Sequence, residues 1–325
     1  MTVLPEVERA VHGLRVRGHG LYLDPRGRPA MGFLAHARAA RPVLPERTVA
    51  TAATVALLSA AQPRALRKAA PLPASYGSPF ALGSLKLTLH PAGHVLGSAQ
   101  LRCEAEGLDL VYAADLGGIG AHASSTAEPR EQLECETLVL RATYGHPRYV
   151  FPPRQAALDE VQAFVERTLR GGDSPVLIAN ALGATQDLVR HLGPRHVLRL
   201  HPTALRACEV YQSQGVALGN YVRLQDEGEV VVVPPTVRTD RLAIPRMRTC
   251  LLSGHALDGK GIADEAVALS DHAGFDQLVD YASRSFATRI FVVHGHVEDL
   301  AAALRGKGRE VHAIRDHHQL PLPGF

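Results

Sequence analysis

Five histidine and aspartate side chains fall at or near the ends of predicted strands, where α/β proteins build their ligand sites. Neutral imidazole and carboxylate groups are donors that bind Zn²⁺ or Mn²⁺. One histidine in such a place is more often structural, but five such side chains in one chain favour a shared site. The five residues are His36, His94, Asp115, His272 and His294.

The stretch around the first of these residues has an unusual composition for a metal loop. Residues 33–42 read FLAHARAARP, so His36 follows an apolar pair and precedes Arg38 and Arg41. A guanidinium does not ligate metals at neutral pH and repels cations, but it forms planar, bidentate contacts with phosphate oxygens. The stretch alone is therefore compatible with a metal loop, the remnant of one, or a surface turn.

Short strands and one early helix make up the predicted N-terminal part. Alternation of leucine with polar residues predicts a strand over residues 85–91, and apolar runs predict strands over 108–114 and 138–140. Residues 48–60, TVATAATVALLSA, predict a helix of small residues that packs closely on a neighbour. Two of the five candidate side chains follow these strands closely.

From about Pro152 the pattern changes to alternating strands and helices, which is typical of a small parallel α/β unit. Strands are expected over residues 175–178 and 197–200, and each is followed by a helix. The tail predicts a helix from residue 275, a buried strand over 290–293 and a second helix after it. The chain is therefore expected to be one α/β domain that a smaller α/β domain interrupts.

Several stretches resemble, in order and spacing, the motifs of the β-CASP nucleases of the metallo-β-lactamase fold. PAGHVLGSAQ at residues 91–100 and VYAADLG at 111–117 resemble the third and fourth motifs of that family, and PAGHVLGSAQ is a specific signal. The others are GLYLDP at 20–25, VATAATVALL at 49–58, TYG at 143–145, SDHAG at 270–274 and VVHGH at 292–296. The resemblance spans essentially the whole chain and is closest to the bacterial DNA-ligase-associated exonucleases, also called mRNA 3′-end processing factor-like proteins.

This resemblance implies an α/β fold, a metallo-β-lactamase αββα sandwich with an inserted β-CASP α/β domain. The sandwich is expected over residues 1–151 and 263–325, and the insert over residues 152–262. A small-molecule hydrolase of the lactamase type is disfavoured, because the insert resembles the cap that closes over nucleic acid in the β-CASP family.

The second motif of the family, HxHxDH, is degenerate in this chain. With His36 aligned to its first histidine, Arg38 stands at the second, Ala40 at the aspartate and Arg41 at the last histidine. The acid of the family's ESTYG motif falls on Arg141. Three of the four replacements are arginine, so the resemblance implies an eroded two-metal site.

The remaining donors divide unequally between the family's two metal positions. His36, His94 and Asp115 remain for the first ion, which is enough for one Zn²⁺ or Mn²⁺ ion with water. Only Asp115 and His294 remain for the second position, which is expected to be empty. The resemblance also assigns His272 as proton donor to the leaving group, with Asp115 as the other catalytic residue. One Zn²⁺ or Mn²⁺ ion, or none, is therefore the expected metal content.

Two interpretations of Arg38, Arg41 and Arg141 remain open: they bind phosphate oxygens of a nucleic acid, or they only neutralise Asp115. The first favours a β-CASP nuclease-like protein that binds DNA or RNA with weak or no phosphodiester hydrolysis, rather than an enzyme. The alternative function is an active single-metal nuclease. An active β-CASP homologue, or another copy of the chain, is an expected protein partner by analogy with inactive family members.

Bulk composition adds few constraints. The 325 residues suit two domains, and the formal charge of +3 is small against 35 basic side chains. Four cysteines without a CxxC pair, and no long apolar run near the start, favour a cytoplasmic protein with no membrane span. Tryptophan is absent, so platforms for base stacking are not obvious.

Overall fold

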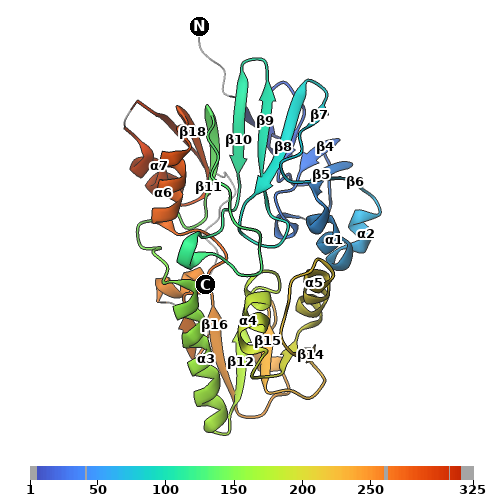
Figure 1. Ribbon diagram of the computed structural model, residues 1–325, viewed down its shortest axis with the longest axis vertical. Coiled ribbons are helices and arrows are strands. Elements are labelled where there is room, and N and C mark those ends of the chain that lie inside the picture. The colour runs from blue at the N-terminus through green and yellow to red at the C-terminus, as the bar shows by residue number, and fades with distance from the viewer. Residues whose placement is uncertain (1–5, 41, 260–262, 307, 316–325) are drawn as a thin grey trace.

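The computed structural model describes residues 6–40, 42–259, 263–306 and 308–315. Its strands form three sheets (Figure 1). The first sheet has the order β1-β2-β3-β4-β5-β6, and the second has the order β19-β18-β11-β10-β9-β8-β7. The strands of the first sheet are β1 (Val7–Ala10), β2 (Gly13–Val16), β3 (Tyr22–Leu23), β4 (Met31–Phe33), β5 (Arg47–Thr51) and β6 (Ala70–Ala74). Those of the second are β7 (Phe80–Leu82), β8 (Leu85–Pro91), β9 (Ala99–Ala105), β10 (Leu108–Ala113), β11 (Thr137–Ala142), β18 (Arg289–Gly295) and β19 (Glu310–Ile314).

These two sheets pack face to face in a sandwich with helices on both outer faces. Their inner faces share one core, to which Phe33 and Val49 contribute from the first sheet and Leu87 and Leu101 from the second. Helices α1 (Ala52–Ala61) and α2 (Pro63–Leu66) cover the outer face of the first sheet. Helices α6 (Phe275–Arg284) and α7 (Val297–Leu304) cover that of the second. This is an αββα arrangement, as the sequence predicted.

The third sheet belongs to the inserted segment, and all its strand pairs are parallel. Its order is β14-β13-β15-β12-β16-β17. Buried parallel strands consist of continuous apolar runs, and β15 is four consecutive valines. The strands are β12 (Ser174–Ile178), β13 (Leu198–Leu200), β14 (Tyr221–Arg223), β15 (Val230–Val233), β16 (Met247–Leu252) and β17 (Glu265–Val267).

Three helices cover one face of this third sheet and lie in front of it in Figure 1. They are α3 (Arg154–Arg170), α4 (Ala184–Leu192) and α5 (Pro202–Ser213). Strand β17 begins at Glu265, after the boundary that the sequence suggested at residue 262, and pairs with β16. The domain limits themselves remain a proposal.

The helix predicted over residues 48–60 is wrong for its first four residues. Residues 48–51 belong to β5, which pairs in parallel with β4 and β6. Three of these four residues are the β-branched Thr48, Val49 and Thr51, which suit a strand between two neighbours. The helix begins at Ala52, and the Thr51 hydroxyl caps it by accepting a hydrogen bond from the backbone N–H of Thr54 at 3.1 Å.

The insert contacts the sandwich through a small apolar cluster beside the candidate site. Ala53 and Leu57 of α1 pack there with Ala207 and Tyr211 of α5. The backbone N–H of Leu96, in the loop between β8 and β9, donates to the Tyr211 hydroxyl at 3.1 Å. The loop that carries one of the candidate histidines is therefore held by the insert. Within the described ranges, no helix is both long and apolar enough to cross a membrane.

Candidate functional site

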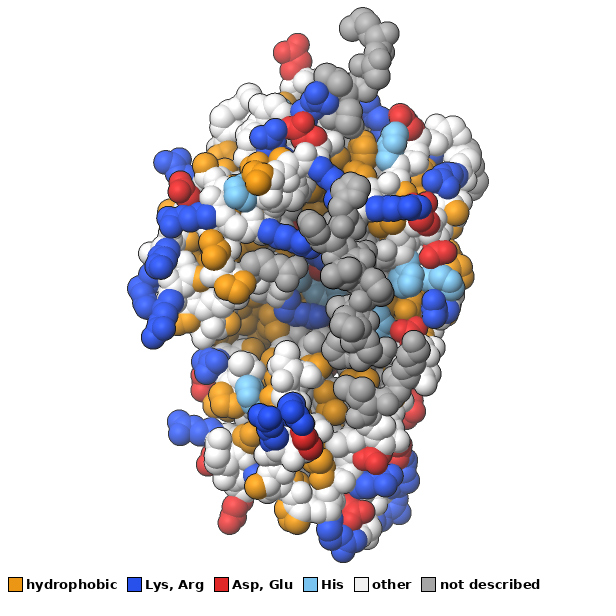
Figure 2. Space-filling model, turned by 180° about the vertical axis from the view of Figure 1, so that it is seen from behind, with side chains coloured by type: hydrophobic (Ala, Val, Ile, Leu, Met, Phe, Trp, Pro, Cys, Tyr) orange, Lys and Arg blue, Asp and Glu red, His pale blue; other side chains and the backbone are white. Residues whose placement is uncertain are grey.

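A cavity of about 350 Å³ opens where the ends of strands from both sandwich sheets meet. Its lining is rich in arginine and histidine, and its carboxylates are few. The charged and imidazole groups of the lining are Arg9, Asp24, Arg26, His36, Arg38, His94, Asp115, Arg141, His272 and His294. Figure 2, which views the molecule from behind, shows Lys and Arg side chains and pale-blue histidines in the hollow at the middle of this face.

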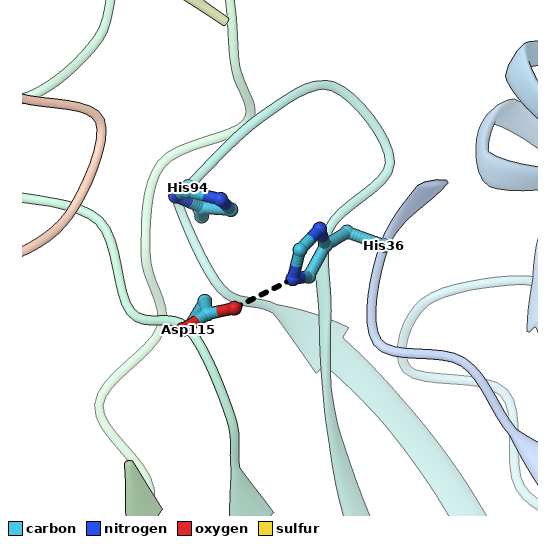
Figure 3. Close-up of side chains that lie close together, drawn as sticks. All are labelled: His36, His94 and Asp115. Atoms are coloured by element: carbon cyan, nitrogen blue, oxygen red, sulfur yellow. Dashed lines mark hydrogen bonds and ion pairs between the residues drawn. The ribbon is translucent and has the colours of Figure 1, made fainter. Parts of the chain in front are cut away.

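Three of the predicted donors form one buried cluster (Figure 3). His36 follows β4, His94 lies in the loop after β8, and Asp115 follows β10. Each side chain offers one ligand atom, and these atoms all lie within 4.8 Å of one another. His36 Nε2 is 2.8 Å from Asp115 Oδ2. The structure therefore brings together the three residues that the sequence assigned to a first metal position.

The orientation of His94 suits a metal ligand. Its Nδ1 lies 3.1 Å from the backbone carbonyl of Asp271, which can only accept, so Nδ1 carries the proton. Its Nε2 is buried and has no hydrogen-bond partner among the described residues. Burial and the neighbouring His272 and His36 hold the pKa of His94 well below its usual range. His94 is thus neutral and directs a lone pair into the cluster.

Asp115 is shared between the imidazoles and an arginine. Arg141, on β11, donates from Nη1 to Asp115 Oδ2 at 3.0 Å, the same oxygen that faces His36. The other oxygen accepts from the Thr143 hydroxyl at 3.3 Å. Burial opposes ionisation of Asp115, but Arg141, His272 and His36 hold its pKa well below the usual range. The carboxylate is therefore ionised, and a guanidinium occupies one side of it.

The last two predicted histidines also lie at this cavity. His272 Nδ1 is 3.5 Å from Asp115 Oδ1, and its ring centroid is 4.2 Å from that of His94. Burial lowers the pKa of His272 to about 3, so it is neutral at pH 7. His294 lines the cavity with a left-handed φ of 55°, next to Gly295, where any Cβ would strike the carbonyl of Ala142. The roles assigned to these residues remain predictions.

Of the two arginines in residues 33–42, the structure describes Arg38. Arg38, in the short 3₁₀ helix η1 (Ala37–Ala39), donates from Nη1 to Asp271 Oδ2 at 3.0 Å. Its side chain is 26% exposed, so it still faces the cavity. Ala40 is the C-cap residue that follows η1 and offers no side-chain donor. Arg41 lies outside the described residues.

A buried ion-pair network behind the cavity escaped the sequence analysis. Arg154, at the start of α3, donates from Nε to Asp187 Oδ2 at 2.6 Å and from Nη2 to Asp271 Oδ1 at 3.2 Å. Asp271 also accepts from Arg38, and its backbone carbonyl faces His94. Asp271 thus connects Arg154 of the insert, Arg38 and the candidate ligand His94. Its position next to His272 in SDHAG was the only available signal.

Asp24 is a second residue whose place the sequence did not assign. It follows β3 within GLYLDP and has a left-handed φ of 44°. Its carboxylate accepts from the backbone N–H of Ala35 at 2.8 Å and from the Tyr112 hydroxyl at 2.9 Å. Burial raises the pKa of Asp24. These bonds hold the segment that leads into His36, which explains how Asp24 supports the site.

Comparisons with known proteins relate the chain to several larger ones. It is 32% identical over 323 residues to a probable DNA ligase of Opitutus terrae, a match that covers 96% of this chain and 31% of the relative. It is 35% identical over 123 residues to transcription termination factor FttA of Methanocaldococcus jannaschii, covering 36% of this chain and 19% of that protein. It is 27% identical over 114 residues to endoribonuclease YSH1 of Gibberella zeae, a match that covers 35% of this chain and 13% of that protein.

The chain therefore spans less than a third of the length of each of these relatives. No protein-family model matches it.

Proposed function

Because the chain belongs to the β-CASP family of the metallo-β-lactamase fold, we propose that its cavity binds the phosphodiester backbone of DNA or RNA with weak or no hydrolysis. The observation that carries this proposal is the contact of 3.0 Å between Arg141 and Asp115. The family resemblance places a metal-bridging role on that carboxylate, and here a guanidinium and an imidazole share one of its oxygens.

The charge balance of the cavity supports an anionic ligand. Four arginines and two carboxylates line it. The low pKa values of His94 and His272 leave these imidazoles neutral at pH 7, so they add no charge. A net positive, partly buried lining repels a divalent cation and attracts phosphate, because Coulomb interactions are screened less there than in bulk water.

Two of the arginines are held in place by the groups behind them. Asp115 orients Arg141, and Asp271 orients Arg38, each through a bond of 3.0 Å. A guanidinium that is already oriented loses less conformational freedom when it binds a phosphate oxygen. We therefore assign phosphate binding to these two side chains, whereas Arg41 carries this role only as a sequence-based proposal.

The chain's residues fit one metal ion but not two. Within the donor cluster, His36 Nδ1 and His94 Nε2 are buried and have no hydrogen-bond partner among the described residues, as expected of a weak or former metal-ligand set. At the second position, Ala40 has no donor and the family's histidine is Arg41. A second ion therefore does not fit.

The donor cluster favours one second candidate, a single-metal nuclease. A bound Zn²⁺ or Mn²⁺ ion would polarise a phosphate oxygen and lower the pKa of a bound water. In that function His36, His94 and Asp115 hold the ion, and Arg38 orients the phosphate. His272, with a pKa of about 3, is neutral and accepts or holds one proton rather than acting as a cationic acid.

Binding of fluorescein-labelled 12-nucleotide DNA and RNA, followed by fluorescence anisotropy in EDTA, tests the proposal. Arg38→Gln and Arg141→Gln are each expected to weaken binding about tenfold and to reduce its dependence on salt. Arg170→Gln, an exposed change on α3, is the matched control and is expected to bind like the wild type. Unchanged affinity and salt dependence in both cavity variants would refute phosphate binding at this site.

A further inference from the structure

The net charge of the whole chain conceals a strongly basic segment. Residues 25–70 contain eight arginine or lysine residues and a single acidic residue, Glu46. Two of the eight, Arg26 and Arg38, line the cavity. The segment forms β4, β5 and the start of β6 in the first sheet, and the helices α1 and α2 that cover the outer face of this sheet. Positive charge therefore extends from the cavity onto this side of the sandwich.

Five basic residues outside the cavity gather around α2, and we name them the α2 patch. Arg47 is paired in register with Ala70 between β5 and β6. Arg28 donates from Nη2 to the backbone carbonyl of Lys68 at 3.0 Å, which brings its loop beside α2. The patch consists of Arg28, Arg47, Arg64, Arg67 and Lys68, and all five are exposed.

Figure 2 places this charge on the same face as the cavity. Lys and Arg side chains follow one another down the left margin, where α1 and α2 of Figure 1 lie after the half turn, and they recur in the central hollow. One red group interrupts the row on the left margin. A polyanion could thus contact both places from one side of the molecule.

The α2 patch is not neutralised by its own side chains. Among the described residues, Arg47, Arg64, Arg67 and Lys68 form no ion pair, and only Arg28 has one, with Glu46 at 3.6 Å. Both members of that pair are about half exposed, so it contributes little. Other exposed arginines do have partners, as in the pairs Arg167–Glu265, Arg238–Asp240 and Arg246–Asp173.

We propose that the α2 patch binds the backbone of a single nucleic-acid strand that continues outward from the cavity. This inference rests on the proposed function and adds the direction in which the strand runs. A cavity of about 350 Å³ is within the range of sites that hold one small molecule, so it accepts a nucleotide and not a duplex. Flexible, unpaired cations contact phosphates without reading the sequence, so this second contact depends on strand length and on salt.

Binding of labelled oligothymidylates of 4 and 20 nucleotides distinguishes contacts with the α2 patch from contacts in the cavity. The triple variant Arg64→Gln, Arg67→Gln, Lys68→Gln is expected to bind the long strand roughly tenfold more weakly and the short strand as the wild type does. Its salt slope for the long strand should fall by about 2, since each single-strand phosphate contact contributes about 0.7. The matched control is Arg170→Gln, Arg206→Gln, Arg223→Gln, three exposed arginines on the insert.

The outcomes distinguish this inference from the function on which it rests. A wild type that binds neither length refutes the proposed function and this inference with it. If the wild type binds both lengths equally, or if the patch variant matches the control, the strand path is wrong while the cavity proposal stands. Loss of binding to phosphatidylserine vesicles with unchanged binding of the long strand would also overturn it, because the patch would then serve a membrane surface.

Discussion

Replacement of Arg154 by methionine should weaken the junction between the insert and the sandwich. Arg154 is 6% exposed, and its guanidinium donates to Asp187, to the Ser270 carbonyl at 2.7 Å and to Asp271. Methionine occupies a similar space along the side chain but supplies neither charge nor donors. The change leaves two buried carboxylates with fewer partners.

The expected loss of unfolding free energy depends on the hydrogen bonds that Asp187 and Asp271 retain in the variant. Removing one member of a buried ion pair costs about 3–5 kcal/mol. Asp187 still accepts from the hydroxyls of Ser124 at 3.1 Å and Thr126 at 2.7 Å, and Asp271 still pairs with Arg38 at 3.0 Å. These remaining bonds place the expected loss of unfolding free energy at the lower end, about 3 kcal/mol.

Unfolding in guanidinium chloride measures this loss of unfolding free energy. Circular dichroism and tyrosine fluorescence report it together, since the chain has eight tyrosines and no tryptophan, and coincident curves establish a single transition. Arg167→Met, which breaks an exposed pair with Glu265, is the control and should change stability by less than about 1 kcal/mol. A loss below about 1 kcal/mol for Arg154→Met would refute the reasoning, because the network would then not stabilise the junction.

Three further predictions concern the cavity and its support. The pKa of His272 is lowered to about 3, so the unfolded chain takes up its proton first; its contribution to stability is complete above about pH 6.5 and decreases as the pH falls toward 3. Between pH 6 and 4, His272→Gln should therefore flatten the pH dependence of the unfolding free energy by about 1.4 kcal/mol per pH unit, and an unchanged slope would contradict the neutral imidazole. Arg141→Glu replaces the guanidinium 3.0 Å from Asp115 with a carboxylate, so the affinity for Mn²⁺, measured by titration calorimetry, should rise at least tenfold. Equal affinity of variant and wild type would mean that Arg141 does not exclude the metal. Gly183 has a φ of 98°, and a Cβ at this position would lie 2.5 Å from Asp271 Oδ2. Gly183→Ala should therefore lower the free energy of unfolding, measured by chemical denaturation, by about 1–3 kcal/mol. Gly215→Ala should lower it less, because Gly215 also has a positive φ but has open space around a Cβ.

The sequence located the candidate site well because strand ends carry a local signal. Polar residues that follow apolar runs predicted His36, His94 and Asp115, and the structure places all three in one cluster. The αββα sandwich was predicted by resemblance of motifs, and the packing of helices on both outer faces agrees with it. Composition alone would not have distinguished this arrangement from other α/β folds.

The charge pairing within the site could not be predicted in the same way. Arg38 pairs with Asp271, which is 233 residues away along the chain, and no local pattern links the two. Arg154 has no signal either, because a basic residue at the start of a helix is more often exposed. The helix predicted from residue 48 began too early because small and β-branched residues suit both a buried strand and a closely packed helix.

The most direct test of phosphate binding without efficient hydrolysis is cleavage of a labelled single strand in added Mn²⁺. Wild type and Asp115→Asn are compared on DNA and RNA, with binding of each strand measured in parallel. We expect the wild type to bind the strand and to produce no more product than Asp115→Asn. Product from the wild type that Asp115→Asn abolishes would contradict this function and establish the single-metal nuclease instead.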